Sequence, residues 1–368
     1  MDAVGDEFEF RIVASDRDLG DKKPFENIQR GRWKQVGKAQ VLYLSPKEKR
    51  LFAWRRLLRA VPYDLVYLNS CFSTLTVMTL LLRRLGLIPD RPVLLAVRGE
   101  FSRGALSLKW LKKKIYLLLS RVFGFYDGIF WHASSRFELE ELKAKFKIPE
   151  KMAFVSMVPV RMASELVPFS GPSDEKMPGP GKERGSARIV FLARIARIKN
   201  LDVALELVGS TSGAIDFDIY GPLEDAIYWK ECQRLLARLP DNVRASYKGI
   251  VPPDRVADVF SQYHLFLFPT QNENFGHVIL EALCAGCPVM TSTGTAWRGL
   301  EAKKAGWDIP LSNLDRYRKA LAQVIDMDAA EFKEMSRSAR LHGHTFVNNP
   351  AILEANRNMF LAALSGTR

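Results

Sequence analysis

The sequence predicts an α/β fold made of two doubly wound domains, each with a mostly parallel sheet between helices. The chain has 368 residues, which is enough for two domains. Apolar runs such as PVLLAV and LFLF are typical of strands that are covered on both faces. Short β-rich runs alternate with helical stretches in both halves of the chain, as in βαβ units.

The expected strands follow one another at the spacing of βαβ units. In the first half they cover residues 10–14, 39–44, 65–68, 93–97, 128–131 and 153–158. In the second half they cover residues 188–193, 216–220, 243–247, 265–268 and 289–292. Between the halves, VPFSGPSDEKMPGPGKERGSA is rich in Pro, Gly, Ser and charge, which predicts an exposed linker. The predicted domains are therefore residues 1–166 and 188–368, joined by a linker at 167–187.

Composition indicates an ordinary globular protein, with 47% hydrophobic and 26% charged residues. No apolar run is long enough for a transmembrane helix, and the acidic start MDAVGDEFEF predicts no signal peptide. The four cysteines are too few for a disulfide framework, so a reducing, cytoplasmic setting is expected. The formal net charge of +13 favours anionic partners, such as phosphorylated ligands, nucleic acid or an acidic membrane surface.

Two cations follow the first strand of the second half. The strand RIVFLA is followed by RIARIKN, which places Arg194 and Lys199 between a strand end and a helix start. Ligands bind at this edge of open α/β sheets, and free backbone N–H groups there attract anions. The spacing alone also allows both side chains to be ordinary solvated residues of a loop.

Two carboxylates lie in the segment FPTQNENFGHVILEALCAGCPVMTS. Glu273 is in the loop after the strand LFLF, and Glu281 is in the apolar helix that follows. Gly276 allows the backbone to approach a ligand at the helix start. A buried carboxylate needs partners, which the hydroxyl groups of a ribose or the neighbouring backbone would supply.

The motifs of the whole chain resemble those of retaining glycosyltransferases of family 4. PTQNENFGHVILEALCAGCPV resembles that family's Glu-x7-Glu segment, and LARIARIKN resembles its basic loop. In the first half, VYLNSCFS, LLAVRGEFSRGALSLKWLKKK and FWHASSRFE are similar to a bacterial branch that builds surface polysaccharides.

The resemblance implies a GT-B fold, in which two Rossmann-like domains face a cleft and a C-terminal helix packs back on the N-terminal domain. It implies a retaining, metal-independent hexosyltransferase whose donor is a nucleotide diphosphate sugar, with UDP favoured over GDP, and which needs no cofactor. The implied acceptor is a glycan or a polyprenyl-diphosphate-linked sugar.

The resemblance also implies roles for individual residues. Arg194 and Lys199 would neutralise the diphosphate, Glu281 would bind the ribose, and Glu273 would hold the donor sugar. The segment that seats the sugar and phosphate would contain Asn274, Phe275, Gly276 and His277.

The sequence departs from the family pattern at three places. The chain opens on what resembles the second strand, so a first βα unit is expected to be missing. Where many relatives carry a His, Arg98, Gly99 and Glu100 stand as candidates for the acceptor or the sugar, or as a salt-bridged loop. His132 is a further candidate for substrate binding, or a core histidine. In TSTGTAW, where relatives carry an Asp and a Pro, Trp297 is expected to pack.

Other motifs favour structural roles. Asp216 and Asp218 lie within a strand, and Cys284 and Cys287 have no second pair nearby, so no metal site is predicted. The segment SLKWLKKKIYLLLSRVFGF predicts a basic amphipathic helix with Lys109, Lys112 and Lys113 on one face. This helix is either an ordinary surface helix or a contact with an anionic inner membrane, which would make the protein peripheral; no nucleic-acid module is recognised. A scaffold protein and a nucleotide-sugar epimerase remain alternative functions.

Overall fold

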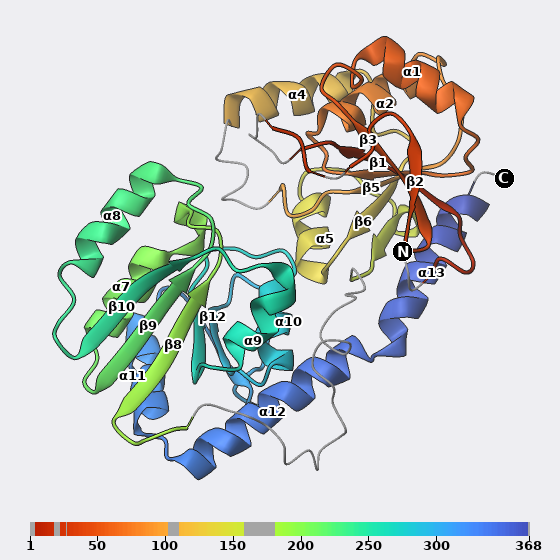
Figure 1. Ribbon diagram of the computed structural model, residues 1–368. Coiled ribbons are helices and arrows are strands. Elements are labelled where there is room, and N and C mark those ends of the chain that lie inside the picture. The colour runs from red at the N-terminus through yellow and green to blue at the C-terminus, as the bar shows by residue number, and fades with distance from the viewer. Residues whose placement is uncertain (1–3, 18–22, 27, 102–109, 158–180, 367–368) are drawn as a thin grey trace. The chain divides into compact units, whose positions relative to one another are not determined.

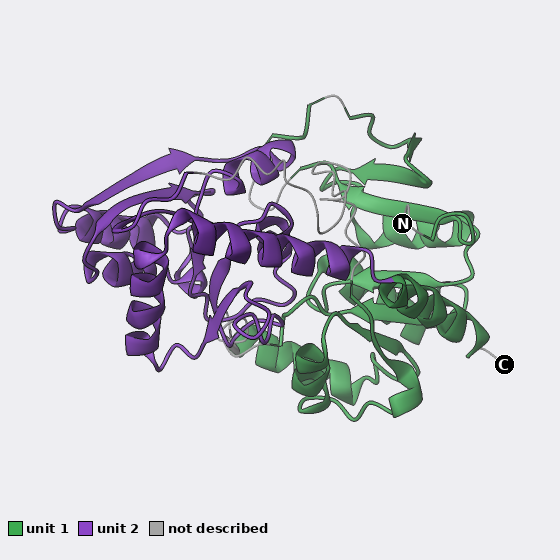
Figure 2. Ribbon diagram, turned by 90° about the horizontal axis from the view of Figure 1, so that it is seen from below, with its two compact units in different colours: residues 1–159, 350–368 green, residues 160–349 purple. Residues whose placement is uncertain are grey.

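The computed structural model describes residues 4–17, 23–26, 28–101, 110–157 and 181–366. The chain divides into two units (Figure 1, Figure 2). Unit 1 comprises Met1–Pro159 and Pro350–Arg368, and unit 2 comprises Val160–Asn349. The last helix of the chain therefore belongs to unit 1, although its neighbours in sequence belong to unit 2.

Unit 1 contains two sheets. The four-stranded sheet has the order β4-β5-β6-β7 and is parallel throughout. Its strands are Val66–Asn69, Val93–Ala96, Phe130–Ala133 and Ala153–Val155. The three-stranded sheet has the order β1-β3-β2, and only β2 runs antiparallel. Its strands are, in chain order, Phe10–Ser15, Trp33–Val36 and Ala39–Leu44. Among the described residues no strand joins the edge strands β1 and β4.

The helices of unit 1 bury apolar faces against these sheets. They are α1 (Leu51–Ala60), α2 (Thr74–Arg84), α4 (Trp110–Val122), α5 (Arg136–Lys143) and α13 (Pro350–Ser365), with a 3₁₀ turn η1 at Glu150–Met152. Serine side chains start two of these helices, because Ser73 caps α2 and Ser135 caps α5. Helices α1 and α2 contribute to a core that includes Trp54 and Leu82.

Helix α13 closes one apolar core of unit 1. Its residues Met359, Phe360 and Ala363 are buried against Leu94 of β5 and Phe130 of β6. The ring of Phe360 lies 5.7 Å from the ring of Phe10 in β1 and 5.7 Å from that of Tyr67 in β4. The expectation that a C-terminal helix packs on the first domain is confirmed, and this helix contacts strands of both sheets.

Unit 2 contains one parallel sheet of six strands in the order β10-β9-β8-β11-β12-β13. The strands are β8 (Ser186–Leu192), β9 (Ala214–Tyr220), β10 (Val243–Gly249), β11 (Leu265–Phe268), β12 (Val289–Ser292) and β13 (Gly306–Ile309). The helices are α7 (Leu201–Gly209), α8 (Ala226–Leu236), α9 (Val256–Phe260), α10 (His277–Cys284), α11 (Leu314–Asp326) and α12 (Ala329–Val347), and the 3₁₀ turns are η2 (Arg197–Lys199) and η3 (Pro253–Arg255). The central strand β11 is buried at every position, as expected for a strand covered on both faces.

The predicted linker lies mostly outside the described residues, as does the end of the strand expected at 153–158. Its described end, from residue 181, is not fully exposed. The Lys182 ammonium group is buried and donates hydrogen bonds to the carbonyls of Ile325 (2.9 Å) and Met327 (2.8 Å). These are carbonyls at the C-terminal end of α11, where a cation is favoured by the helix dipole.

Candidate active site

The predicted donor residues of unit 2 gather at the carboxyl ends of β8 and β11, which are neighbours in the sheet. The loop after β8 leads through η2 to α7, and the loop after β11 leads to α10. Two hydrogen bonds connect the two loops: the backbone N–H of Gln271 donates to Ile198 O (2.9 Å), and the side-chain amide of Asn200 donates to Pro269 O (2.9 Å). The two loops therefore form one continuous rim.

Lys199 and Glu273 form an ion pair across this rim. The Lys199 ammonium group donates to the Glu273 carboxylate, and only 9% of the lysine side chain is exposed. The same ammonium group lies 5.5 Å from the centre of the Phe268 ring, at the end of β11. The structure thus brings together the cation predicted for the diphosphate and the acid predicted for the sugar.

Arg194 lies at the same edge but in a different environment. It pairs with Glu224, and 57% of its side chain is exposed. An exposed pair of this kind contributes little to stability, because water screens it. Arg194 can therefore exchange its partner for a ligand at smaller cost than the buried Lys199.

Two helices begin at this rim without side-chain caps. Helix α7 starts after Asn200 (φ 54°) and α10 after Gly276 (φ 78°), both in the left-handed region, and neither residue caps its helix. Uncapped helix starts expose backbone N–H groups to a ligand and favour negative charge. A Cβ atom at Gly276 would also lie 3.1 Å from Cγ of Glu273, so glycine leaves room for this acid.

Glu281 lies in α10, one turn beyond its start. Its side chain leans toward the start of the helix, as helical side chains do. Burial raises the pKa of Glu281 to about 7, and no hydrogen bond or ion pair to a described residue offsets this burial. A carboxyl group in this state gains stability from any ligand that donates hydrogen bonds to it.

The remaining predicted residues of the rim are held by aromatic packing. The ring of Phe275 lies 4.8 Å from that of His277, and the Trp297 indole N–H donates to Phe275 O (2.7 Å). Trp297 is buried, so it fixes the loop that carries Glu273 and Asn274. The sequence predicted only packing for Trp297; its hydrogen bond was missed because no sequence pattern reports on an indole donor.

In unit 1, Arg98 lies just after the carboxyl end of β5 and donates the first of a series of linked hydrogen bonds. Its guanidinium group donates to Asn69 Oδ1 (2.8 and 3.0 Å) and to the Tyr67 hydroxyl (3.0 Å). The Tyr67 hydroxyl lies 2.6 Å from Nδ1 of His132, whose Nε2 lies 2.6 Å from Ser156 O. Because a carbonyl only accepts, Nε2 carries the proton and Tyr67 donates to Nδ1.

Of the two roles that the sequence left open for His132, these hydrogen bonds favour that of a core histidine, which positions Tyr67. Both ring nitrogens are used, the side chain is buried, and burial together with Arg98 lowers the pKa of His132 to about 4. With a pKa of about 4, the imidazole is neutral near pH 7.

Glu100 and Gly99 form hydrogen bonds that hold the loop after β5 to neighbouring segments. The Glu100 carboxylate accepts from the Ser70 hydroxyl (2.6 Å) and from Cys71 N–H (2.5 Å). Gly99 N–H donates to the buried Glu138, an acid that the sequence analysis did not single out. Among the described residues, Arg98 makes no ion pair with Glu100, Glu138 or any other acid. In the part of the chain that the structure describes, the loop that contains Arg98 and Glu100 is therefore held by hydrogen bonds and not by the ion pair that the sequence allowed.

One of the three lysines predicted on the basic face of α4 points elsewhere. The Lys113 ammonium group is turned inward, 5.0 Å from the centre of the Phe72 ring, whereas Lys112 is exposed. Lys109 lies outside the described residues. No described helix is long and apolar enough to cross a membrane.

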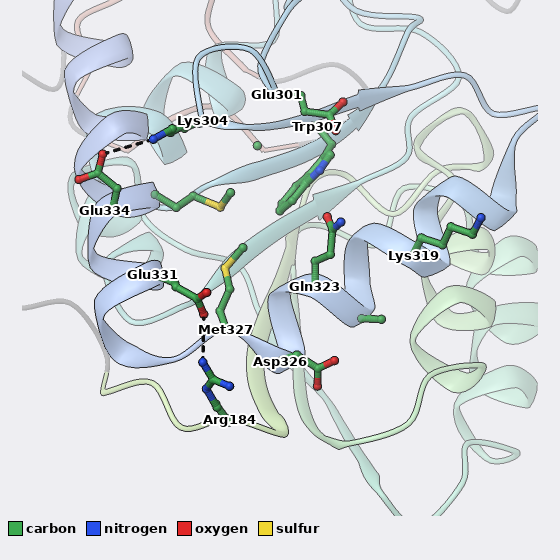
Figure 3. A pocket seen from close by; sticks show the side chains of 13 residues that line it. Arg184, Glu301, Lys304, Trp307, Lys319, Gln323, Asp326, Met327, Glu331 and Glu334 are labelled. Carbon is green, nitrogen blue, oxygen red and sulfur yellow. Dashed lines mark ion pairs between the residues drawn. The ribbon is translucent and has the colours of Figure 1, made fainter.

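A cavity of about 820 Å³ lies elsewhere in unit 2, between β13, α11 and α12. Figure 3 shows two ion pairs among its side chains, Arg184 with Glu331 and Lys304 with Glu334, both at 3.8 Å. Gly306 and Trp307 line this cavity from the amino end of β13, whereas the rim lies at the carboxyl ends of the strands. The cavity is therefore separate from the candidate site.

The other chemical motifs have local partners. Asp218 accepts from the Tyr263 hydroxyl (2.7 Å) and pairs with Lys248 (3.4 Å). Cys284 and Cys287 are buried and unbonded to each other. Among the residues that the structure describes, no cluster of three His, Cys, Asp or Glu side chains has metal-binding geometry.

The family comparison agrees with this geometry. Residues 172–342 match the family model described as glycosyl transferases group 1. The matched segment carries the rim, both acids and both cations. The match lies within unit 2 and covers less than half of the chain.

Curated relatives are similar to parts of the chain. D-inositol 3-phosphate glycosyltransferase of Paenarthrobacter aurescens (strain TC1) is 27% identical over 184 residues, covering 45% of this chain and 42% of the relative. The enzyme of that name from Streptomyces griseus is 28% identical over 224 residues, covering 55% and 47%. The chain thus spans less than half the length of these relatives.

Two solved structures share the fold of most or all of the chain. HepE of Anabaena, solved in complex with UDP and glucose, has a TM-score of 0.64 at 14% identity and covers 88% of this chain and 86% of its own. Sucrose-phosphate synthase of Thermosynechococcus elongatus has a TM-score of 0.68 at 14% identity, covering 100% and 92%. The predicted GT-B fold class is therefore confirmed.

Proposed function

We propose that the protein is a glycosyltransferase that moves a sugar from a nucleotide diphosphate sugar to a glycan or polyprenyl-diphosphate-linked acceptor in bacterial polysaccharide biosynthesis. The observation that carries this proposal is Glu281, a buried carboxyl group beside an uncapped helix start, without a described partner. Ribose hydroxyl groups would donate the hydrogen bonds that it lacks.

The donor would occupy the rim of unit 2. Its diphosphate would receive charge-assisted contacts from Lys199 and Arg194 and backbone contacts from the starts of α7 and α10. Lys199 would turn partly from Glu273 to the phosphate, which releases the Glu273 carboxylate to accept from sugar hydroxyls. UDP is favoured over GDP as the nucleotide of the donor because the similar HepE structure contains UDP.

The reaction would need positioning and electrostatics more than covalent chemistry. As the glycosyl bond breaks, negative charge grows on the leaving diphosphate, and preorganised cations and helix starts stabilise that charge. The reaction would be metal-independent because these groups take the place of a metal ion. It would retain the anomeric configuration of the sugar because the acceptor enters on the face that the leaving group occupied.

The acceptor would be bound by unit 1 through Arg98. This cation is held by neutral partners, Asn69 and Tyr67, so its charge is available to an anionic group. A diphosphate-linked acceptor carries such a group. An acceptor of this kind lies at the inner membrane face, which would make the protein cytoplasmic and peripheral.

Calorimetry and product analysis test this function. UDP-glucose should bind, and its transfer to a polyprenyl-diphosphate-linked sugar should persist in EDTA and yield the α-anomer by NMR. Arg98→Gln should raise the KM for the acceptor and leave the Kd for UDP-glucose unchanged, while Arg59→Gln on the exposed face of α1 serves as the matched control. Failure to bind any UDP- or GDP-linked sugar would contradict the proposal, and binding without transfer or hydrolysis would favour a scaffold protein.

A further inference from the structure

Tyr228 is a fully buried tyrosine of α8 whose hydroxyl group reaches the start of α7. The hydroxyl donates a hydrogen bond to Oδ1 of Asp202 (2.6 Å) and accepts one from the backbone N–H of Asp202 (3.0 Å). Asp202 is the acid in the first turn of α7, the helix that begins at the rim. One phenol group therefore fixes both the carboxylate and the backbone of this residue.

An acid in the first turn of a helix normally stabilises the helix by facing its free backbone N–H groups. At the start of α7, these N–H groups and the neighbouring Lys199 are the proposed contacts of the donor diphosphate. A carboxylate that faced them would therefore compete with the ligand for the same positive potential. The position of the Asp202 carboxylate is thus a property of the donor site.

The strand order shows on which side of the rim Tyr228 holds this carboxylate. Helix α8 follows β9, whereas the ion pair of Lys199 and Glu273 joins the loops after β8 and β11. Strands β9 and β11 lie on opposite sides of β8 in the sheet. The Asp202 carboxylate is therefore bound on the β9 side, whereas Lys199 faces the β11 side.

The ring of Tyr228 also supports the turn that carries Lys199. The Arg197 guanidinium group lies 5.1 Å from the centre of this ring and pairs with Glu231 of α8 (2.7 Å). Arg197 and Lys199 belong to the same 3₁₀ turn, η2. Contacts of a cation with an aromatic ring and with a carboxylate both favour one position of its side chain. Helix α8 thus holds η2 and the start of α7 together.

We propose that Tyr228 is a positioning residue of the donor site, which keeps the Asp202 carboxylate away from the diphosphate. This role depends on the proposed function, because it requires a diphosphate at the rim. A hydrogen bond between α7 and α8 also stabilises the fold, so a loss of stability alone does not identify the role. The two roles differ in their dependence on charge, because only the positioning role depends on the negative charge of Asp202.

A double-mutant cycle measured by calorimetry with UDP at pH 8 tests the proposal. Tyr228→Phe keeps the ring under Arg197 but frees the Asp202 carboxylate. It should raise the Kd for UDP about five- to tenfold, as expected for a like charge near the phosphates. Adding Asp202→Asn to this variant should return the Kd to within about twofold of the parent value, because the competing charge is gone. Asp202→Asn in the parent should have a much smaller effect, which shows that Tyr228 and Asp202 are coupled.

Three controls separate positioning from folding. Urea unfolding should show that the double variant stays less stable than the parent although its affinity recovers. Binding of uridine, which has no phosphate, should be equal in all variants by NMR. Tyr263→Phe removes the hydroxyl of another buried tyrosine of unit 2, which donates to Asp218 (2.7 Å) before the start of β11. This variant should bind UDP as the parent does.

The variants and the parent decide different questions. Unchanged affinity for UDP in Tyr228→Phe would overturn the proposal, and so would a double variant that binds UDP as weakly as Tyr228→Phe. Equal effects of Asp202→Asn with and without the Tyr228 hydroxyl would also overturn it, because the hydroxyl would then not control the carboxylate. A parent protein that binds neither UDP nor GDP would instead overturn the proposed function, and this role of Tyr228 with it.

Discussion

Glu281 is the side chain whose protonation couples the candidate site to pH. Since its pKa is raised to about 7, a growing fraction of the carboxyl group is protonated as the pH falls below 7. A ribose needs the ionised form as acceptor. The Kd for UDP-glucose should therefore be flat above pH 7 and rise up to tenfold per pH unit below it. UDP-glucose is the suitable probe because UDP itself has a phosphate that titrates near pH 6. Calorimetry from pH 5.5 to 8.5 measures this, and a similar slope in Glu281→Gln would assign the titration elsewhere.

The same residue should lower the stability of the free protein. Its folded pKa lies above the unfolded value of about 4.5, so the folded state holds its proton more tightly, and stability is lost as the pH rises from about 4.5 through 7. At 1.36 kcal/mol per pKa unit the loss is at most about 3 kcal/mol. Glu281→Gln should therefore raise the free energy of unfolding at pH 8 by about 1–3 kcal/mol and leave it nearly unchanged at pH 4. Urea titrations at both pH values measure the difference; a variant that is less stable at pH 8 would show that Glu281 is already satisfied.

At the residue scale, sequence reasoning found the acids and cations of the rim but not their mutual pairing. The order along the chain places Lys199 and Glu273 after neighbouring strands, and parallel pairing of β8 and β11 then brings them to one edge. Whether they pair with each other depends on loop geometry that no spacing encodes. The two roles of His132 stayed open for a similar reason, because a histidine after a strand looks the same in sequence whether its ring nitrogens are free or hydrogen-bonded.

At the scale of elements, the loop after β11 depends on Trp297 for its shape. Trp297→Phe retains the packing on Phe275 but leaves the Phe275 carbonyl without the indole donor. An unsatisfied buried carbonyl costs about 1–3 kcal/mol. Urea unfolding should show this loss, and affinity for UDP-glucose should fall because the loop also carries Glu273. Trp307→Phe, at another buried tryptophan with no described hydrogen bond from its indole, is the control and should leave affinity unchanged. Equal affinity in both variants would separate Trp297 from the site.

The strands that sequence predicted best are those with continuous apolar runs. The expected ranges 265–268 and 289–292 coincide with β11 and β12, since burial on both faces leaves an unbroken pattern. Strands β2 and β13 were missed. Their sequences, WKQV and GWDI, are short and mix polar with apolar residues, so only pairing with β3 and β12 makes them strands. The separation of unit 1 into two sheets was likewise invisible, because pairing between distant strands leaves no local pattern.

At the scale of the whole molecule, α13 makes the stability of unit 1 depend on the end of the chain. Phe360→Ala removes a ring that contacts both sheets, and such buried changes typically cost about 3–5 kcal/mol. The unfolding transition of unit 1 should move to lower temperature, whereas the transition that UDP-glucose stabilises should not. Differential scanning calorimetry with and without UDP-glucose separates the two. Leu353→Ala, at an exposed position of the same helix, is the control. If both transitions shifted together, the units would unfold as one.

The return of α13 to unit 1 also has a consequence for biosynthesis. A ribosome releases the chain from the N-terminus, and domains commonly fold in that order at about 5–20 residues per second. Here the later unit, Val160–Asn349, is contiguous and can complete its core first, whereas Met1–Pro159 must wait for Pro350–Arg368. During that interval, roughly ten to forty seconds at these rates, the face formed by Leu94 and Phe130 lacks the cover of α13. We therefore expect the nascent first half to expose this apolar face to solvent, or to whatever binds it, until Pro350–Arg368 has been synthesised.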